Sequence, residues 1–80
     1  MRLPRDVSGA DLVRSLRQLN NQISRQSGSH IRLTTETNGV HHITVPNHSP
    51  LRIGTLASIL DEVALHFHLS RDELLKRLKL

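Results

Sequence analysis

The residue of this sequence best suited to proton transfer is His30. It follows Gly28-Ser29 and opens an alternating run, in which Ile31 and Leu33 share one face of a strand and His30 and Arg32 share the other. Imidazole groups ordinarily titrate near pH 6.5, which suits general acid–base catalysis at about neutral pH. On an exposed strand face, His30 would take a proton from a ribose 2′-hydroxyl or give one to a leaving oxygen. The same spacing also fits a solvated histidine without a chemical role.

Further polar side chains are expected close to His30. The alternation places three of them on its sheet face and two just past the end of the facing strand: Ser24, Gln26, Arg32, Asn47 and His48. The guanidinium of Arg32 would neutralise a phosphate and stabilise a pentavalent oxyanion. The imidazole of His48 would be a second proton-transfer group. For both residues the alternative is an ordinary exposed side chain.

A second candidate anion site lies further along the chain. Arg52 precedes Gly54-Thr55, where a helix is expected to start with free N–H groups and the positive end of its dipole. Capping of that helix by Thr55 or by loop groups explains the same residues without a ligand. Arg2 and Arg5 form a short basic arm that would add phosphate contacts.

The composition favours a polyanionic partner and excludes several classes of function. The 80 residues include 11 Lys+Arg against 7 Asp+Glu, which gives a formal charge of +4. Nine of these cations are arginines, which bind phosphate through paired hydrogen bonds. Nucleic acid is the simplest such partner, although an ordinary soluble surface carries a similar charge. The chain is too short for a two-domain nucleotide enzyme, and it has no Gly-rich phosphate loop, no nucleophile elbow and no Trp or Tyr on which bases would stack.

The sequence gives no sign of a metal site, another cofactor or a membrane anchor. It has no cysteine, which excludes a disulfide framework, a thiol nucleophile and a Cys-type zinc site. It has six histidines but no H-E-x-x-H motif, and His41 and His42 would point to opposite faces of a strand. We therefore expect neither a metal nor another cofactor. No apolar run approaches 18 residues and no secretory leader is present, so we expect a cytoplasmic protein.

The spacing of the apolar residues predicts the elements that hold these side chains. A capping box at Ser8 and Asp11 opens a helix that ends at Asn20-Asn21. Residues 22–46 alternate as three strands, a second helix runs from Gly54 through position 67, and a second capping box at Ser70 opens a short final helix. The prediction is an α+β fold of one domain, residues 1–80, with a helix, a three-stranded antiparallel sheet, a helix and a short C-terminal helix. The helices lie on one face of the sheet.

The apolar positions also predict how the strands pair. A three-residue loop at Thr37-Asn38-Gly39 pairs Leu33 with Ile43 and Ile31 with Val45, which matches apolar faces. The same reasoning at Ser27-Gly28-Ser29 pairs Ile23 with Leu33 and Gln26 with His30. The first strand contains few apolar residues.

Taken together, these motifs are similar to those of a known family. The blocks that carry the resemblance are Leu3-Pro4, Ser8-Gly9 with Leu12 and Leu19, Arg25-Gln26-Ser27-Gly28-Ser29-His30, Thr44-Val45-Pro46-Asn47-His48, and Gly54-Thr55-Leu56 with Ile59-Leu60. In this order and at these distances they resemble the HicA (YcfA-like) toxins. The resemblance covers about residues 2 to 78. It implies a fold similar to the double-stranded RNA-binding domain.

The resemblance also implies a function. Such toxins are mRNA interferases of type II toxin–antitoxin systems, which cleave RNA without the ribosome, and their catalytic histidine follows a Gly-Ser pair, here Gly28-Ser29 before His30. It implies a metal-independent endoribonuclease acting on single-stranded or flexible mRNA, and a HicB-type antitoxin that covers the active face and whose gene is typically adjacent. The residues expected to contact RNA are Arg25, Gln26, Ser29, Arg32, His48 and Arg52. The alternative is a non-catalytic RNA-binding module on the same fold.

Overall fold

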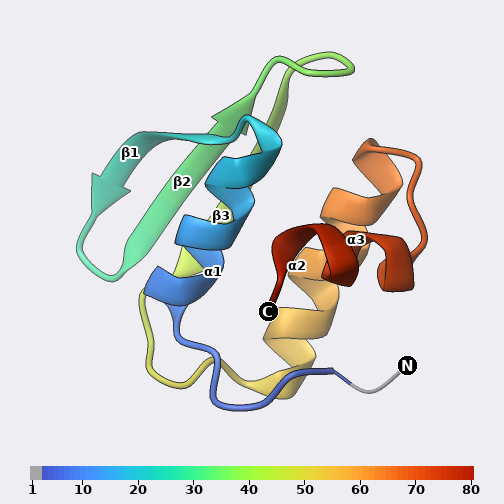
Figure 1. Cartoon of the computed structure of the whole chain (residues 1–80). Coiled ribbons are helices and arrows are strands. Elements are labelled where there is room, and N and C mark those ends of the chain that lie inside the picture. The colour runs from blue at the N-terminus through green and yellow to red at the C-terminus, as the bar shows by residue number, and fades with distance from the viewer. Residues whose placement is uncertain (1–2) are drawn as a thin grey trace.

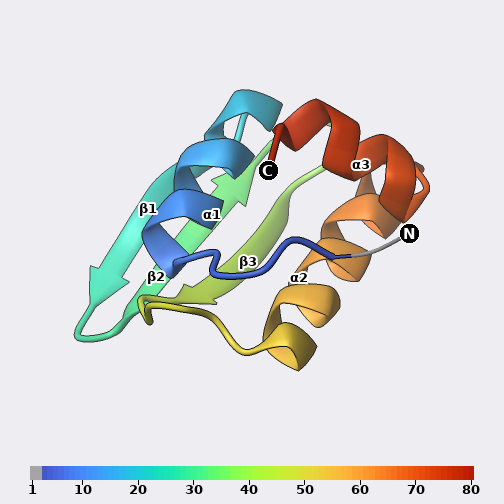
Figure 2. The same ribbon diagram turned by 60° about the horizontal axis from the view of Figure 1, so that its bottom comes forward.

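The computed structural model describes residues 3–80, so the expected contribution of Arg2 lies outside the described residues. The elements follow one another as α1 (Gly9–Leu16), the 3-10 helix η1 (Arg17–Leu19), β1 (Gln22–Ser27), β2 (His30–Thr35), β3 (His41–Pro46), α2 (Ile53–His66) and α3 (Arg71–Leu78). The strands form one antiparallel sheet in the order β1-β2-β3. Figures 1 and 2 show α1 lying along the sheet and α2 packed beside α3. This arrangement confirms the predicted α+β class.

Local hydrogen bonds set the starts of two helices, as the sequence predicts. The amide of Asp11 donates to the Ser8 hydroxyl at 3.0 Å, and the amide of Ser8 donates to the Asp11 carboxylate at 3.3 Å. Ser70 and Glu73 form the same pair of bonds at the start of α3, at 3.1 and 3.0 Å. Asn20, in the left-handed conformation with φ of 62°, ends the first helical segment. Helix α2 begins at Ile53, one residue before the predicted Gly54.

The hydrophobic core lies between the helices and one face of the sheet. The sheet contributes alternate residues from its middle strand and from β3, and each helix contributes one apolar stripe; the most deeply buried of these side chains are Leu12, Leu16, Leu33, Val45, Leu56, Leu60, Val63, Leu74 and Leu78. Strand β1 contributes nothing to this core, because all six of its residues are exposed. The opposite face of the sheet is therefore open to solvent. Among residues 3–80, no helix is long and apolar enough to cross a membrane.

The two hairpins differ in how closely they follow the sequence prediction. Leu33 faces Ile43 and Ile31 faces Val45, as predicted. Ile23 also faces Leu33 as predicted, but the register of β1 then shifts between Ile23 and Arg25. The predicted pair of Gln26 with His30 is wrong: an extra residue in β1 places Ser27 opposite His30 and shortens the connection to the two residues Gly28 and Ser29.

Candidate functional site

The solvent face of the sheet carries His30, as its position in the alternating run predicts. His30 is the first residue of β2 and lies between Ser27 of β1 and Pro46 of β3. Its side chain is exposed, whereas its neighbour Ile31 is buried in the core. The imidazole of His30 is therefore accessible to a ligand bound across the three strands.

Two arginines lie next to each other beside His30. Arg25 of β1 is directly opposite Arg32 of β2, so both side chains leave the sheet on the face of His30. Within residues 3–80 the salt bridges are those of Arg14 with Asp11 and Arg71 with Asp61, so no carboxylate neutralises this pair. Like charges in directly opposed positions repel each other. An anion between the two guanidinium groups would relieve that repulsion.

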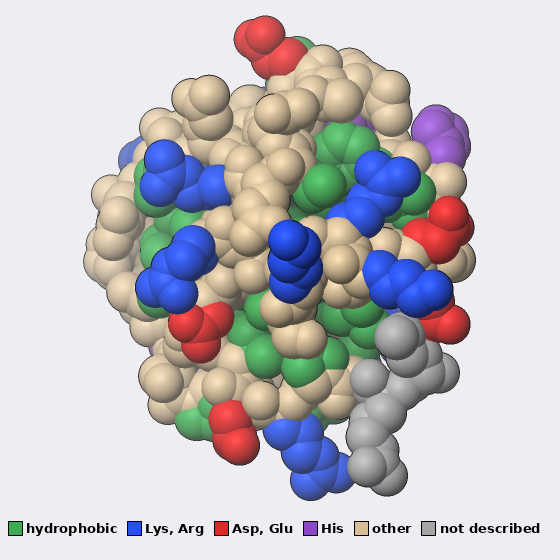
Figure 3. Space-filling view, in the orientation of Figure 1, with side chains coloured by type: hydrophobic (Ala, Val, Ile, Leu, Met, Phe, Trp, Pro, Cys, Tyr) green, Lys and Arg blue, Asp and Glu red, His purple; other side chains and the backbone are tan. Residues whose placement is uncertain are grey.

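The distribution of acidic residues makes the sheet a distinct surface. None of the 7 Asp+Glu of the chain falls within the three strands, whereas Arg25 and Arg32 do. On the helix-bearing side, cationic and acidic side chains are interspersed (Figure 3). The strand residues around His30 thus carry positive charge with no acidic residue among them, and Glu36 follows directly after the far end of β2.

The loop after β3 is fastened to the same end of the sheet. The amide of Asn47 donates to the carbonyl oxygen of Ser29 at 2.6 Å, and the amide of Gly9 donates to the carbonyl oxygen of His48 at 2.8 Å. A side chain at Gly9 would collide with the carbonyl oxygen of Pro46, so glycine lets α1 approach this loop. The exposed side chains of Asn47 and His48 therefore lie at the end of the sheet that carries His30. Ser29 contributes its backbone to this arrangement.

Three other candidate residues are not brought into this cluster. Gln26 faces Ile31 across the strands, so the bulge turns its side chain to the opposite side of the sheet from His30, contrary to the prediction. Arg52 is exposed at the start of α2, which lies away from the turn between β1 and β2 in both Figures 1 and 2. Arg5 lines a hollow with Leu75 and Lys76 of α3, on the helix side.

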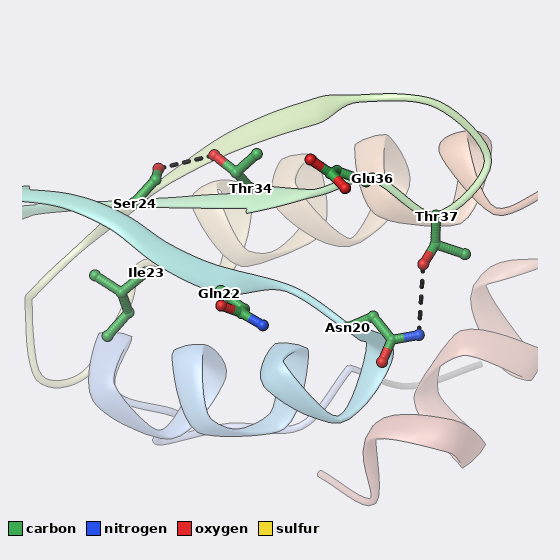
Figure 4. Close-up of a pocket in the computed structure, with 7 residues that line it drawn as sticks. All are labelled: Asn20, Gln22, Ile23, Ser24, Thr34, Glu36 and Thr37. Carbon is green, nitrogen blue, oxygen red and sulfur yellow. Dashed lines mark hydrogen bonds between the residues drawn. The ribbon is translucent and has the colours of Figure 1, made fainter.

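Sequence reasoning missed a hydrogen-bonded group that crosses the sheet at the end remote from His30. The hydroxyl of Thr34 lies 2.8 Å from the hydroxyl of Ser24 and 2.8 Å from Nδ1 of His42, and the Ser24 hydroxyl lies 3.3 Å from the carbonyl oxygen of Arg32. Ser24 and Thr34 also line a surface hollow between the start of β1 and the β2–β3 hairpin (Figure 4). The polar alternation of β2 and β3 was the only sequence signal for this group.

A second histidine contact links the sheet to the helices. The ring of His41, at the start of β3, stacks on the ring of His66 at the end of α2, with centroids 4.5 Å apart and planes at 16°. Nε2 of His66 lies 2.8 Å from the carbonyl oxygen of Thr37 and therefore donates a hydrogen bond to it. Burial lowers the pKa of His41 and the nearby His66 lowers it further, while Glu62 opposes the shift. His41 and His42 thus point to opposite faces of the sheet, as predicted.

The described residues hold no cluster suited to a metal ion. Within residues 3–80 no group of three or more His, Asp or Glu side chains is arranged to bind one. The groups that the site presents are an exposed imidazole, two adjacent guanidinium groups and the polar loop after β3.

Comparison with known proteins identifies one family. A family model described as the HicA toxin of bacterial toxin–antitoxin matches residues 9–65. The matched span begins at the first residue of α1, contains all three strands and includes nearly all of α2. Neither the comparison with curated proteins nor that with solved structures gives a match.

Proposed function

The chain belongs to the HicA toxin family of bacterial toxin–antitoxin systems, and on that basis we propose that it is an endoribonuclease that cleaves mRNA on the open face of its sheet, independently of the ribosome. Family membership makes the chain the toxin of such a system and implies a cognate antitoxin. The observation that carries the nuclease proposal is the exposed His30 beside the unneutralised pair of Arg25 and Arg32.

In the proposed reaction the ribose supplies the nucleophile. The 2′-oxygen attacks the adjacent phosphorus and the bond from phosphorus to the 5′-oxygen breaks, which leaves a 2′,3′-cyclic phosphate and a 5′-hydroxyl. One proton leaves the 2′-oxygen and one reaches the 5′-oxygen, and His30 is the group proposed to transfer them. Arg32, with Arg25 opposite it, stabilises the charge that accumulates on the phosphoryl oxygens.

The residues at the end of the sheet are proposed to hold the RNA in place. Ser29 precedes His30 in the chain, and His48 lies in the loop after β3 at the same end of the sheet; His48 is the candidate for a second proton-transfer group. Gln26 and Arg52 point to other parts of the surface, so any contact they make involves RNA that extends beyond the cleavage site. Extended single-stranded or flexible RNA is the substrate proposed, because unpaired RNA leaves its bases and sugars accessible to side chains on the open sheet face.

The proposed antitoxin partner is a HicB-type protein that covers this face. Such a protein would block RNA by occupying the surface of Arg25 and Arg32, and acidic side chains would complement that surface. A matching test is competition: the antitoxin should displace RNA from the His30→Ala variant, and the variant in which Arg25 and Arg32 are both glutamine should bind the antitoxin more weakly.

The nuclease proposal is tested by incubating purified protein with RNA in the presence of a chelator. The parent chain should cleave, and His30→Ala should cleave about 10²–10⁴-fold more slowly, which is the usual contribution of one acid–base group. The matched control is His68→Asn, which removes a different exposed histidine. The backbone of His68 is in the left-handed conformation, which asparagine tolerates. It should cleave like the parent.

Two outcomes of this assay separate the alternatives. Equal cleavage by the parent and His30→Ala removes His30 from the mechanism. No cleavage by either protein, combined with RNA binding by both, supports a non-catalytic RNA-binding module instead. Far-ultraviolet circular dichroism and a thermal melt of each variant show whether a loss of activity reflects unfolding.

A further inference from the structure

The hydrogen bonds around Thr34 can all form with only one assignment of donors and acceptors. The carbonyl oxygen of Arg32 accepts and cannot donate, so the hydroxyl of Ser24 must donate its single proton to it. The Ser24 oxygen then accepts the proton of Thr34, since Ser24 has no second one. Thr34 has no proton left for His42, so Nδ1 of His42 must be the donor to the Thr34 oxygen.

This order of donors fixes the tautomer of neutral His42. Because Nδ1 carries the proton, Nε2 carries none and presents a lone pair. The side chain is exposed, and it lies on the same sheet face as Arg32, since His42 is directly opposite Thr34. The chain from Ser24 through Thr34 therefore holds an imidazole whose outer nitrogen is a hydrogen-bond acceptor. The exposed position of the side chain leaves Nε2 open to a donor on a bound ligand.

The position of His42 relative to His30 determines which part of a ligand it meets. Thr34 lies four residues after His30 on β2, which is about 13 Å along a strand. Two groups that hydrogen-bond one phosphate must each approach it within about 3 Å. If RNA is bound along the strands, the nucleotide that reaches His42 is therefore not the one at His30, and Arg32 lies between the two histidines.

The hollow beside this group is suited to a nucleoside rather than to a phosphate. Its lining includes the side chains of Asn20, Gln22 and Glu36, and its one charged group is an acid (Figure 4). Amide and carboxylate groups hydrogen-bond the edges of bases, whereas a carboxylate repels a phosphate. Ser24 and Thr34 form one wall of this hollow, which places His42 next to it.

We propose that His42, held by Ser24 and Thr34, is the acceptor for the ribose 2′-hydroxyl of a nucleotide bound away from the cleaved linkage. This inference rests on the proposed function and extends it with a second nucleotide site. RNA supplies a hydroxyl at that point and DNA does not, so the contact contributes to the selection of RNA. His42 is a binding residue here and takes no part in proton transfer at His30.

The test uses the His30→Ala chain, which binds RNA without cleaving it, and a set of oligonucleotides with a single 2′-deoxy substitution at each position in turn. Fluorescence anisotropy should show one position, separate from the cleaved linkage, where the substitution weakens binding about three- to tenfold, the usual effect of one hydrogen bond. Adding His42→Ala should weaken binding of the all-RNA oligonucleotide by a similar factor and abolish the sensitivity at that position.

One further measurement tests the tautomer of His42 directly and needs no RNA. Nitrogen-15 NMR of the neutral imidazole should show His42 protonated at Nδ1, and Thr34→Val should remove that preference while Thr34→Ser retains it. The proposal is overturned if His42 is protonated at Nε2, or if the 2′-deoxy profile is the same with and without His42. If the parent chain neither binds nor cleaves any RNA, the proposed function itself fails, which is a different result from an unchanged profile in a chain that binds.

Discussion

The opposed pair of Arg25 and Arg32 gives a quantitative prediction for RNA binding. Each guanidinium that neutralises a phosphate of a single strand contributes about 0.7 to the slope of log affinity against log salt concentration. Because the two arginines leave the same face side by side, each should contact the RNA backbone. Arg25→Gln and Arg32→Gln should each lower the magnitude of that slope by about 0.7, and the double variant by about 1.4.

The size of this effect makes it measurable. When salt is raised from about 50 to 200 mM, the RNA affinity of the parent and of each variant falls by a certain factor. With a slope smaller by about 0.7, that factor is about 2.6 times smaller for each single variant than for the parent. Affinity would be measured by fluorescence anisotropy at four or more salt concentrations, with every variant in the His30→Ala chain so that the RNA stays intact.

Arg17→Gln is the matched control for this experiment. Arg17 is exposed on η1, outside the sheet, so its loss changes the net charge of the protein equally without touching the proposed RNA surface. Its slope should equal that of the parent. A reduction at Arg17 as large as at Arg25 would refute the reasoning, because binding would then depend on total charge rather than on the face of His30.

Two further predictions concern stability. Gly9→Ala brings a Cβ against the backbone of Pro46 and should lower the free energy of unfolding by about 1–3 kcal/mol, which is roughly 4–8 °C in Tm for each kcal/mol. Gly54→Ala is the control, because its Cβ meets open space and should leave Tm unchanged or raise it. Equal decreases in Tm for the two variants would contradict this prediction. Because the pKa of His41 is lower in the folded chain than in the unfolded chain, the unfolded chain binds the proton at a higher pH. The free energy of unfolding should therefore decrease as pH falls from about 6.5 to the pKa of folded His41. His41→Phe, which retains a ring against His66, should flatten that part of the Tm–pH profile, and an unchanged profile would contradict the assignment.

Much of the fold is predictable because its determinants are short-range or strongly patterned. The capping pairs of Ser8 and Ser70 involve groups three residues apart, so the local sequence is sufficient to locate the helix starts. The pairing of β2 with β3 follows from the burial of Ile31 and Leu33, since a slip of one residue would expose both. The same alternation predicts that His30 faces solvent.

Strand β1 is where sequence reasoning fails, because both of its faces are exposed. With little apolar surface to bury, a shift of one residue carries only a small energetic penalty, so the residue pattern cannot fix its register. The residue pattern therefore does not predict the bulge at Ser24. As a result it places Gln26 on the face of His30, where the structure has Arg25. The register of a strand cannot be inferred from apolar positions when the strand has few apolar residues.

The sequence by itself determined the starts of the helices to within a residue, the apolar faces of β2 and β3 and the outward direction of His30, because each depends on contacts along the chain or on a strict period of buried residues. Only the tertiary structure decided that Arg25 faces Arg32, that the Ser24–Thr34 hydrogen bonds orient His42, and that His41 stacks on His66. These contacts join polar residues from different elements, and polar side chains at a surface carry no periodic signature from which their partners can be inferred.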